Sequence, residues 1–185
     1  SALVAQGKND EAITHYRRAV ELNPKDVDAY KNLGDAYIHQ GRNEEAIACY
    51  RRVLQLNPDY KKVHTDLGIA LVQQGQADEA IIHFRQALEQ NSNDVEAHYS
   101  LAVVLVDKGQ ISEAVTHYRQ ALQIKPDHAD AQNNLGIALA RLGQTEEAIA
   151  HFRQTLQLNP DRADVHNNLG SALIQGGKTE EAMDH

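Results

Sequence analysis

The chain has 185 residues, 42% of them apolar and 24% charged, which is enough apolar material for a folded core and too much for an intrinsically disordered protein. No apolar run approaches the roughly 20 residues that a transmembrane helix needs, so no membrane partner is expected. The formal net charge of −8 argues against a nucleic acid partner. A single cysteine, Cys49, excludes an internal disulfide and is compatible with a reducing compartment, so the cytoplasm is the favoured location.

One spacing runs through the whole sequence, because glycine and alanine each recur every 34 residues. The glycines are Gly7, Gly41, Gly75, Gly109, Gly143 and Gly177, and the alanines are Ala12, Ala46, Ala80, Ala114, Ala148 and Ala182. A proline recurs in the same period at Pro24, Pro58, Pro126 and Pro160. Ser92 takes its place in the remaining junction, which predicts a less rigid turn there. A fixed period of this length predicts tandem copies of one supersecondary unit.

The predicted elements begin with a partial repeat at 1–26, which opens midway through a first helix, turns at Gly7 and continues into a second helix. Four full repeats follow, at 27–60, 61–94, 95–128 and 129–162. A last partial repeat at 163–185 completes a first helix and stops early in a second. Both ends interrupt a repeat, so we expect one array that is a fragment of a longer one.

Each full repeat is predicted to form two antiparallel helices, and 27–60 illustrates the signals. Apolar residues at helical spacing precede Gly41, which is expected to end the first helix because glycine tolerates the left-handed cap conformation. Asn43 is the expected N-cap of the second helix. Pro58 stops that helix, because proline cannot continue the backbone hydrogen bonds.

Small residues recur in the middle of the first helices, at Gly34, Gly68, Ala102, Gly136 and Gly170. A glycine costs a helix about 1 kcal/mol relative to alanine, so its recurrence predicts a close approach of the backbone to the partner helix. Aromatic residues recur in the second helices, at Tyr16, Tyr50, Phe84, Tyr118 and Phe152. They are expected to fill the core between helices.

Residues 27–60 carry a recognisable set of residues at Tyr30, Leu33, Gly34, Tyr37, Ala46, Tyr50 and Pro58. In this respect the chain resembles the tetratricopeptide repeat family over its whole length. It departs from the family where Val53 replaces a second alanine, and at four positions where the leading aromatic is replaced, which are His64, His98, Gln132 and His166. The resemblance implies an all-α, right-handed α-solenoid of antiparallel helix hairpins, with the first helices lining a concave groove.

The sequence contains no phosphate loop and no GxGxxG, GxSxG or HExxH motif, so neither catalysis nor a cofactor is expected. The nearest phosphate-loop candidate is the string from Gly176 to Thr179. It lacks the glycine that such a loop needs five residues before Gly177, and it falls at a predicted turn between helices.

Histidines recur in two columns, which are His15, His83, His117, His151 and His185, and His64, His98 and His166. Members of one column belong to successive hairpins, roughly 20 Å apart, so a single column cannot chelate a metal. The two columns could approach each other, but surface or interface histidines are the preferred interpretation and no metal site is expected. Protonation of all ten histidines would change the formal charge from −8 to +2, so a pH response stays open.

The resemblance places candidate binding residues on the face of the first helices that lines the groove. The polar candidates are Lys31, Asn32, Asp66, Tyr99, Asn133, Asn134, Asn167 and Asn168, and the apolar candidates are Ile69, Val103 and Ile137. Carboxamides donate and accept hydrogen bonds, so they can pair with the backbone of an extended peptide while the apolar residues hold its side chains. The alternative is that the apolar residues pack beneath the second helices. The Asn-Asn-Leu-Gly strings at 133–136 and 167–170 resemble the asparagine ladder of the O-GlcNAc transferase superhelix.

One known use of the family is not expected here. Members that hold chaperone C-terminal tails use a clamp of lysine, asparagine and arginine, of which only Lys31 is matched, and Asp35 and Asp66 would repel a carboxylate. We therefore expect a non-catalytic protein–protein interaction scaffold that binds an extended peptide or a partner helix. The alternatives are a homo-oligomer formed head to tail through the repeat ends, and the targeting arm of a larger enzyme such as a glycosyltransferase.

Overall fold

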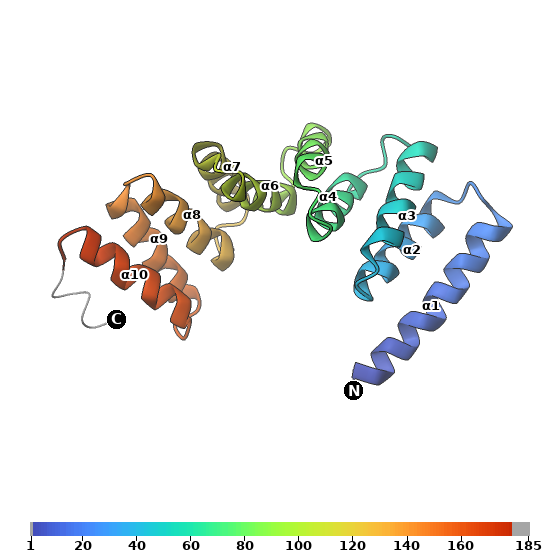
Figure 1. The fold of residues 1–185 in the computed structure, drawn as a ribbon, viewed down its shortest axis with the longest axis horizontal. Helices are drawn as coiled ribbons and strands as arrows, with labels where there is room; N and C mark the ends of the chain where they lie inside the picture. Colours follow the sequence, from blue (N-terminus) through green and yellow to red (C-terminus); the bar gives the residue numbers. More distant parts are fainter. Residues whose placement is uncertain (1, 179–185) are drawn as a thin grey trace. The chain divides into compact units, whose positions relative to one another are not determined.

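The computed structural model describes residues 2–178, with side chains from Lys8 onward. These residues form α-helices and no strand (Figure 1). The helices are α1 (Ala2–Leu22), α2 (Val27–His39), α3 (Asn43–Leu56), α4 (Val63–Gln73), α5 (Ala77–Gln90), α6 (Val95–Asp107), α7 (Ile111–Ile124), α8 (Ala129–Arg141), α9 (Thr145–Leu158) and α10 (Ala163–Gln175). The prediction of an all-α protein made of helix hairpins is confirmed. None of the described helices combines the length and the apolar character that crossing a membrane requires. Two residues of the sequence columns, Ala182 and His185, lie outside the described residues.

The chain divides into two compact units, Ser1–Ser92 and Asn93–His185. The first contains α1 to α5 and the second contains α6 to α10. The boundary falls in the junction where Ser92 replaces the recurring proline, which is the junction that the sequence predicts to be less rigid. Within each unit, helices that follow one another pack side by side, and Figure 1 shows the hairpins α2–α3 and α4–α5 in one unit and α6–α7 and α8–α9 in the other.

A Schellman motif closes the turn between the first and the second helix of each hairpin, as α2 and α3 illustrate. The N–H of Gly41 donates to the carbonyl of Ile38 at 2.9 Å, and the N–H of Arg42 donates to that of Tyr37 at 2.9 Å. Gly41 has a φ of 70°, a left-handed conformation that costs a residue with a side chain about 1–2 kcal/mol. The glycines at this place in the other hairpins have φ of 72° to 76°, and they are Gly75, Gly109, Gly143 and Gly177. The predicted helix ends at these glycines are confirmed.

The second helix of the hairpin begins without a side-chain cap, so the prediction of Asn43 as N-cap is wrong. α3 already includes Asn43, and its N-cap is Arg42, whose side chain makes no capping hydrogen bond. The Schellman turn leads directly into α3 and leaves Asn43 inside the first helical turn. Its Oδ1 is buried without a hydrogen-bond partner. The acidic residues of the first turn, Glu44 and Glu45, provide the negative charge that favours a helix N-terminus.

α1 runs without a break from Ala2 to Leu22, so the turn predicted at Gly7 is absent. Gly7 lies inside this one long helix, and α1 packs against α2.

α4 begins two residues later than the repeat register predicts, at Val63. In α2 the corresponding N-cap is Asp26, whose carboxylate accepts the N–H of Ala29 at 2.9 Å. Tyr60 stands in this place before α4, and its hydroxyl donates to Asp28 on α2 at 2.8 Å. α4 starts after Lys62, which has a left-handed φ of 70°.

Glycines in the first helices leave notches that aromatic rings of the second helices fill. A methyl group on Gly68 would lie 2.5 Å from Cε1 of Phe84, and one on Gly136 would lie 2.6 Å from Cε1 of Phe152. Both rings are buried. The predicted core role is confirmed for Tyr50, Phe84, Tyr118 and Phe152, whereas Tyr16 is partly exposed. The close approach at these glycines is made by a side chain and not by the backbone of the partner helix.

The notch predicts opposite effects of one substitution at two equivalent places. Gly68→Ala is expected to lower the free energy of unfolding by about 1–2 kcal/mol, because overpacking against Phe84 outweighs the gain in helix propensity. Gly170 is the matched control, because no atom of the described residues lies within 4 Å of the place its Cβ would take. Gly170→Ala is expected to raise the free energy of unfolding by up to about 1 kcal/mol. Chemical denaturation measures both changes, and equal shifts of the same sign would contradict the notch.

Candidate functional site

A run of hydrogen-bonded polar side chains crosses the first helices of the second unit. Asn168 on α10 donates through Nδ2 to Oδ1 of Asn133 on α8 at 3.1 Å. Asn133 in turn donates to Oδ1 of Asn134 at 3.3 Å, and Asn134 donates to the hydroxyl of Tyr99 on α6 at 3.3 Å. These four residues, here called the amide ladder, join three successive first helices. All four are candidates from the sequence, and the structure brings them together.

The members of the amide ladder differ in their exposure. The Asn133 side chain is buried, with the residue 4% exposed, so it positions its neighbours instead of facing a ligand. Asn134, Asn168 and Tyr99 are partly exposed. Each carboxamide has two N–H donors and an accepting oxygen, so the ladder offers donors and acceptors that a peptide backbone can use.

Tyr99 is held in place by rings on both sides. Its ring stacks on His128 with centroids 4.8 Å apart and lies 6.1 Å from the ring of Tyr118. His128 is itself fixed, because its Nδ1 accepts the N–H of Ala131 at the start of α8. Burial raises the pKa of the Tyr99 hydroxyl, and Asp130 and Glu96 add to the effect. The hydroxyl therefore stays protonated and neutral at physiological pH.

The apolar candidates Ile69, Val103 and Ile137 are all partly exposed, so they are neither open to solvent nor sealed beneath the second helices. Ile69 and Ile137 each line a pocket, one in each unit. Asn32 on α2, Val103 on α6 and Asn167 on α10 line neither pocket. The sequence candidates that line a pocket are Lys31, Asp66, Ile69, Ile137 and Asn168.

The pocket of the second unit, here called the Ile137 pocket, has a volume of about 290 Å³ between α8 and α10. It is lined by Ile137, Ala140, Arg141, Phe152, Asn168, Ser171, Ala172 and Gln175. Phe152 on α9 contributes the ring that also fills the notch at Gly136. Asn168 is shared with the amide ladder, so the pocket and the ladder form one continuous site.

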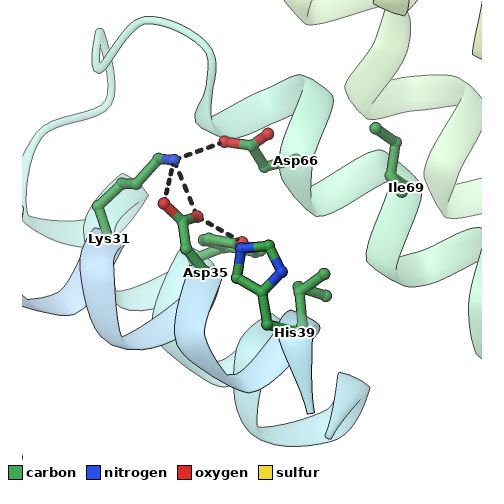
Figure 2. Close-up of a pocket in the computed structure, with 7 residues that line it drawn as sticks. Lys31, Asp35, His39, Asp66 and Ile69 are labelled. Atoms are coloured by element: carbon green, nitrogen blue, oxygen red, sulfur yellow. Dashed lines mark hydrogen bonds and ion pairs between the residues drawn. The ribbon is translucent and has the colours of Figure 1, made fainter. Parts of the chain in front are cut away.

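The pocket of the first unit, here called the Asp35 pocket, has the same volume of about 290 Å³ and lies between α2 and α4. It is lined by Lys31, Asp35, Ile38, His39, Tyr50, Asp66 and Ile69. Figure 2 shows the Lys31 side chain extending between Asp35 and Asp66, with Ile69 on the neighbouring helix. Lys31 donates to the two carboxylate oxygens of Asp35 at 2.8 and 2.6 Å, and its ammonium lies 3.1 Å from Asp66 Oδ2.

The charges of the Asp35 pocket are well defined. Burial acts to lower the pKa of Lys31, but its contacts with Asp35 and Asp66 outweigh burial, and the pKa is raised. Tyr50 donates its hydroxyl to Asp35 at 2.8 Å, and burial together with this carboxylate raises the pKa of the phenol. Lys31 is therefore a cation and Tyr50 is neutral at physiological pH. With two carboxylates and one ammonium, and histidine counted as neutral, the pocket carries one excess negative charge.

Four residues of the Asp35 pocket were not among the site candidates from sequence, namely Asp35, His39, Ile38 and Tyr50. Lys31, Asp35 and His39 are spaced four residues apart, which places them on one face of α2. That spacing could have identified Asp35 and His39 from the sequence. Tyr50 could not be found in this way, because its sequence column indicates a core residue and only the notch brings its hydroxyl to Asp35.

The two histidine columns meet inside the hairpins. Nδ1 of His64 lies 3.1 Å from Nδ1 of His83, and Nδ1 of His98 lies 2.9 Å from Nδ1 of His117. In the next repeat Gln132 takes the first place and its Oε1 lies 2.6 Å from Nδ1 of His151. At these distances one ring donates an N–H and the other accepts it. Among the described residues, no group of three or more His, Cys, Asp or Glu side chains is placed to hold a metal ion.

The chain is similar to known repeat proteins. The family model for the cilia and flagella-associated protein 70 C-terminal domain matches residues 2–185. YrrB, described as a TPR protein with an unusual peptide-binding site, is 25% identical, with a TM-score of 0.76 over 90% of this chain and 86% of YrrB. No curated protein sequence matches.

Two further solved structures show the shared fold. MamA from Desulfovibrio magneticus RS-1 is 23% identical, with a TM-score of 0.80 over 86% of this chain and 90% of that chain. The APC/C hetero-tetramer Cut9–Hcn1 has a chain that is 21% identical, with a TM-score of 0.75 over 97% of this chain and 36% of that one. At this level of identity, the likeness concerns the repeat architecture alone.

Proposed function

Because the chain belongs to the tetratricopeptide repeat family, represented by the cilia and flagella-associated protein 70 C-terminal domain, we propose that it is an interaction scaffold whose first helices bind an extended peptide segment of a partner protein. The observation that carries the proposal is the amide ladder from Asn168 to Tyr99. The ladder supports a role in binding.

The ladder suits an extended ligand because its members belong to successive repeats. A helix satisfies its own backbone hydrogen bonds, whereas an extended segment leaves its N–H and C=O groups for a partner. A segment that crosses α6, α8 and α10 would meet a carboxamide or a hydroxyl on each helix. The Ile137 pocket beside Asn168 would then hold one of its side chains.

The similarity to YrrB, which is described as having a peptide-binding site, supports this choice of ligand. The neutral character of the ladder supports it further. Amides that pair with a peptide backbone do not depend on the side chains of the ligand, so the ladder would supply affinity and the pockets would supply selectivity.

Peptide display against the chain tests the proposal. We expect the parent to enrich a set of extended sequences, and a variant with Asn134→Ala and Ile137→Asp to bind them at least about tenfold more weakly, because a ladder donor is lost and a charge faces the pocket. The control carries Gln123→Ala and Gln157→Asp, which change exposed positions on α7 and α9. Helical content and melting temperature are measured for all three.

The results separate binding on the first helices from binding elsewhere. Equal binding by the parent and by the variant with Asn134→Ala and Ile137→Asp would mean that the peptide binds to another surface. A parent that enriches no peptide and whose mass rises with concentration in light scattering would favour self-assembly instead.

A further inference from the structure

The Asp35 pocket and the Ile137 pocket occupy the same place in the repeat. Six of the positions that line the first recur in the second, three repeats of 34 residues later. In both pockets the ring from the second helix, Tyr50 or Phe152, fills the notch of a glycine on the first helix. The two pockets are therefore one structural site that carries two different sets of side chains.

The substitutions between the two pockets change charge, and two of them also reduce apolar bulk, since Ala140 and Ser171 stand where the first unit has Ile38 and Ile69. Ile137 stands where the first unit has Asp35, and Asn168 stands where it has Asp66. At the rim of the second pocket a positive charge is gained, because Arg141 takes the place of His39. The Asp35 pocket is thus acidic, and the Ile137 pocket is uncharged inside with a cation at its rim.

The carboxylates of the Asp35 pocket remain accessible although Lys31 contacts both. The side chain of Asp35 is 37% exposed and that of Asp66 is 31% exposed, whereas that of Lys31 is 22% exposed. Lys31 therefore lies deeper than the groups it neutralises. Both carboxylates therefore keep exposed surface at the opening of the pocket.

We infer that the Asp35 pocket selects a basic side chain, arginine or lysine, from the bound peptide, whereas the equivalent Ile137 pocket rejects one. This inference rests on the proposed function, since it specifies which ligand residue the first unit recognises. The cationic end of the side chain contacts Asp35 and Asp66, and its methylene groups pack against Ile38 and Ile69 at the walls. Asp35 and Asp66 are the specificity-determining residues.

Lys31 has a defined part in this recognition. Its ammonium already occupies the position between the two carboxylates, so it competes with the cation of the ligand and moderates the affinity. Removal of this charge leaves both carboxylates for the ligand. Lys31→Met is therefore expected to strengthen the binding of a basic peptide, while Asp66→Asn is expected to weaken it.

The test compares two peptides that differ only in charge. One is acetylated and amidated Ser-Gly-Val-Arg-Val-Gly-Ser, and the other has citrulline, a neutral analogue of arginine, at the central position. Each is titrated into the full chain labelled on isoleucine methyl groups, and NMR follows Ile69 and Ile137 separately. Because Ile69 lines one pocket and Ile137 the other, each resonance reports one site.

We expect the arginine peptide to shift Ile69 with an affinity at least about tenfold above that of the citrulline peptide, and the preference to shrink as salt is raised. The variant with Asp35→Ile and Asp66→Asn takes the residues of the Ile137 pocket at the two acidic positions and should lose the preference, whereas Lys31→Met should increase it. Asp127→Asn, which removes an exposed carboxylate outside both pockets, controls for the change in net charge.

Equal affinity of the two peptides at Ile69, or a preference that survives Asp35→Ile with Asp66→Asn in a folded variant, would overturn the inference while leaving the proposed function intact. If neither peptide shifts either isoleucine in the folded parent, the inference fails, and the display experiment separately decides the proposed function. Asp66→Asn alone gives the same comparison with one small substitution, in case the double variant loses helical content.

Discussion

Phe84→Ala is expected to lower the free energy of unfolding by about 3–5 kcal/mol, the usual cost of removing a buried phenylalanine ring. The ring is 0% exposed and fills the notch above Gly68. Because Gly68 has no side chain that could move into the space, the cavity left by the ring cannot close from that side. The loss therefore includes both the apolar contacts of the ring and the cost of the cavity.

The effect is measured by denaturant unfolding together with hydrogen exchange, because the two units need not unfold as one. Protection should fall most in α4 and α5. Ile82→Ala on the same helix is the control, since Ile82 is 56% exposed and its truncation is expected to change stability by no more than about 0.5 kcal/mol. Similar losses for the two variants would show that the Phe84 ring does not fill a notch.

Acidification is expected to destabilise the first unit through the His64–His83 pair. Burial lowers the pKa of His64, and the nearby His83 adds to this. Burial also lowers the pKa of His83, against the opposing effects of Gln86 and Glu79. The unfolded chain therefore binds more protons than the folded one below the ordinary histidine pKa of 6.5, so stability is present above that pH and is lost as the pH falls through it.

The geometry of the pair agrees with this direction. The two Nδ1 atoms lie 3.1 Å apart, so one proton between them makes a hydrogen bond, whereas a proton on each would set two donors face to face. Glu79 lies 3.8 Å from Nε2 of His83 and favours its protonation, but Glu79 is itself engaged by Arg51 at 2.8 Å. Burial and the facing imidazole therefore dominate.

A later repeat of the same chain suggests a substitution that removes this pH response. Gln132 replaces the first histidine in a later repeat and accepts from His151, so His64→Gln should keep a hydrogen bond to His83 while removing one titrating group. We expect hydrogen-exchange protection of α4 and α5 in this variant to fall less between pH 7.5 and pH 5.5, a window about one unit either side of the free histidine value. His15→Gln changes an exposed histidine and should leave the profile as it is. An unchanged profile for His64→Gln would rule out the pair as its source.

Much of the local structure could be predicted from the sequence because its causes are local. The left-handed glycine at the turn, the proline after the second helix and the helical spacing of apolar residues all act within a few positions. Errors arose where a local signal met a neighbouring constraint. Asn43 has the chemistry of an N-cap, but the Schellman turn before it places it inside α3. Gly7 has the spacing of a turn, but it lies inside the continuous helix α1.

The candidate site could be predicted only in part, because a pocket joins residues from three helices. The repeat period placed Ile69, Asn134 and Ile137 on the first helices, and the structure adds which of them line a pocket. The hydroxyl of Tyr50 reaches Asp35 from the second helix. No spacing along one helix reports such a contact, since it depends on how two helices pack.

The sequence by itself therefore determined the repeat, its family, the hairpins and the residues that form the core, because a period of 34 residues repeats the same short-range preferences in every copy. Only the tertiary structure decided which residues meet. In the folded chain the two histidine columns meet in pairs, and hydrogen bonds link the side chains from Asn168 to Tyr99. Two pockets form at equivalent places of the repeat, one acidic and one without charge inside. The physical reason is that these contacts form between helices, where packing of rings against glycines sets the distance and the side chains at each register position set the chemistry.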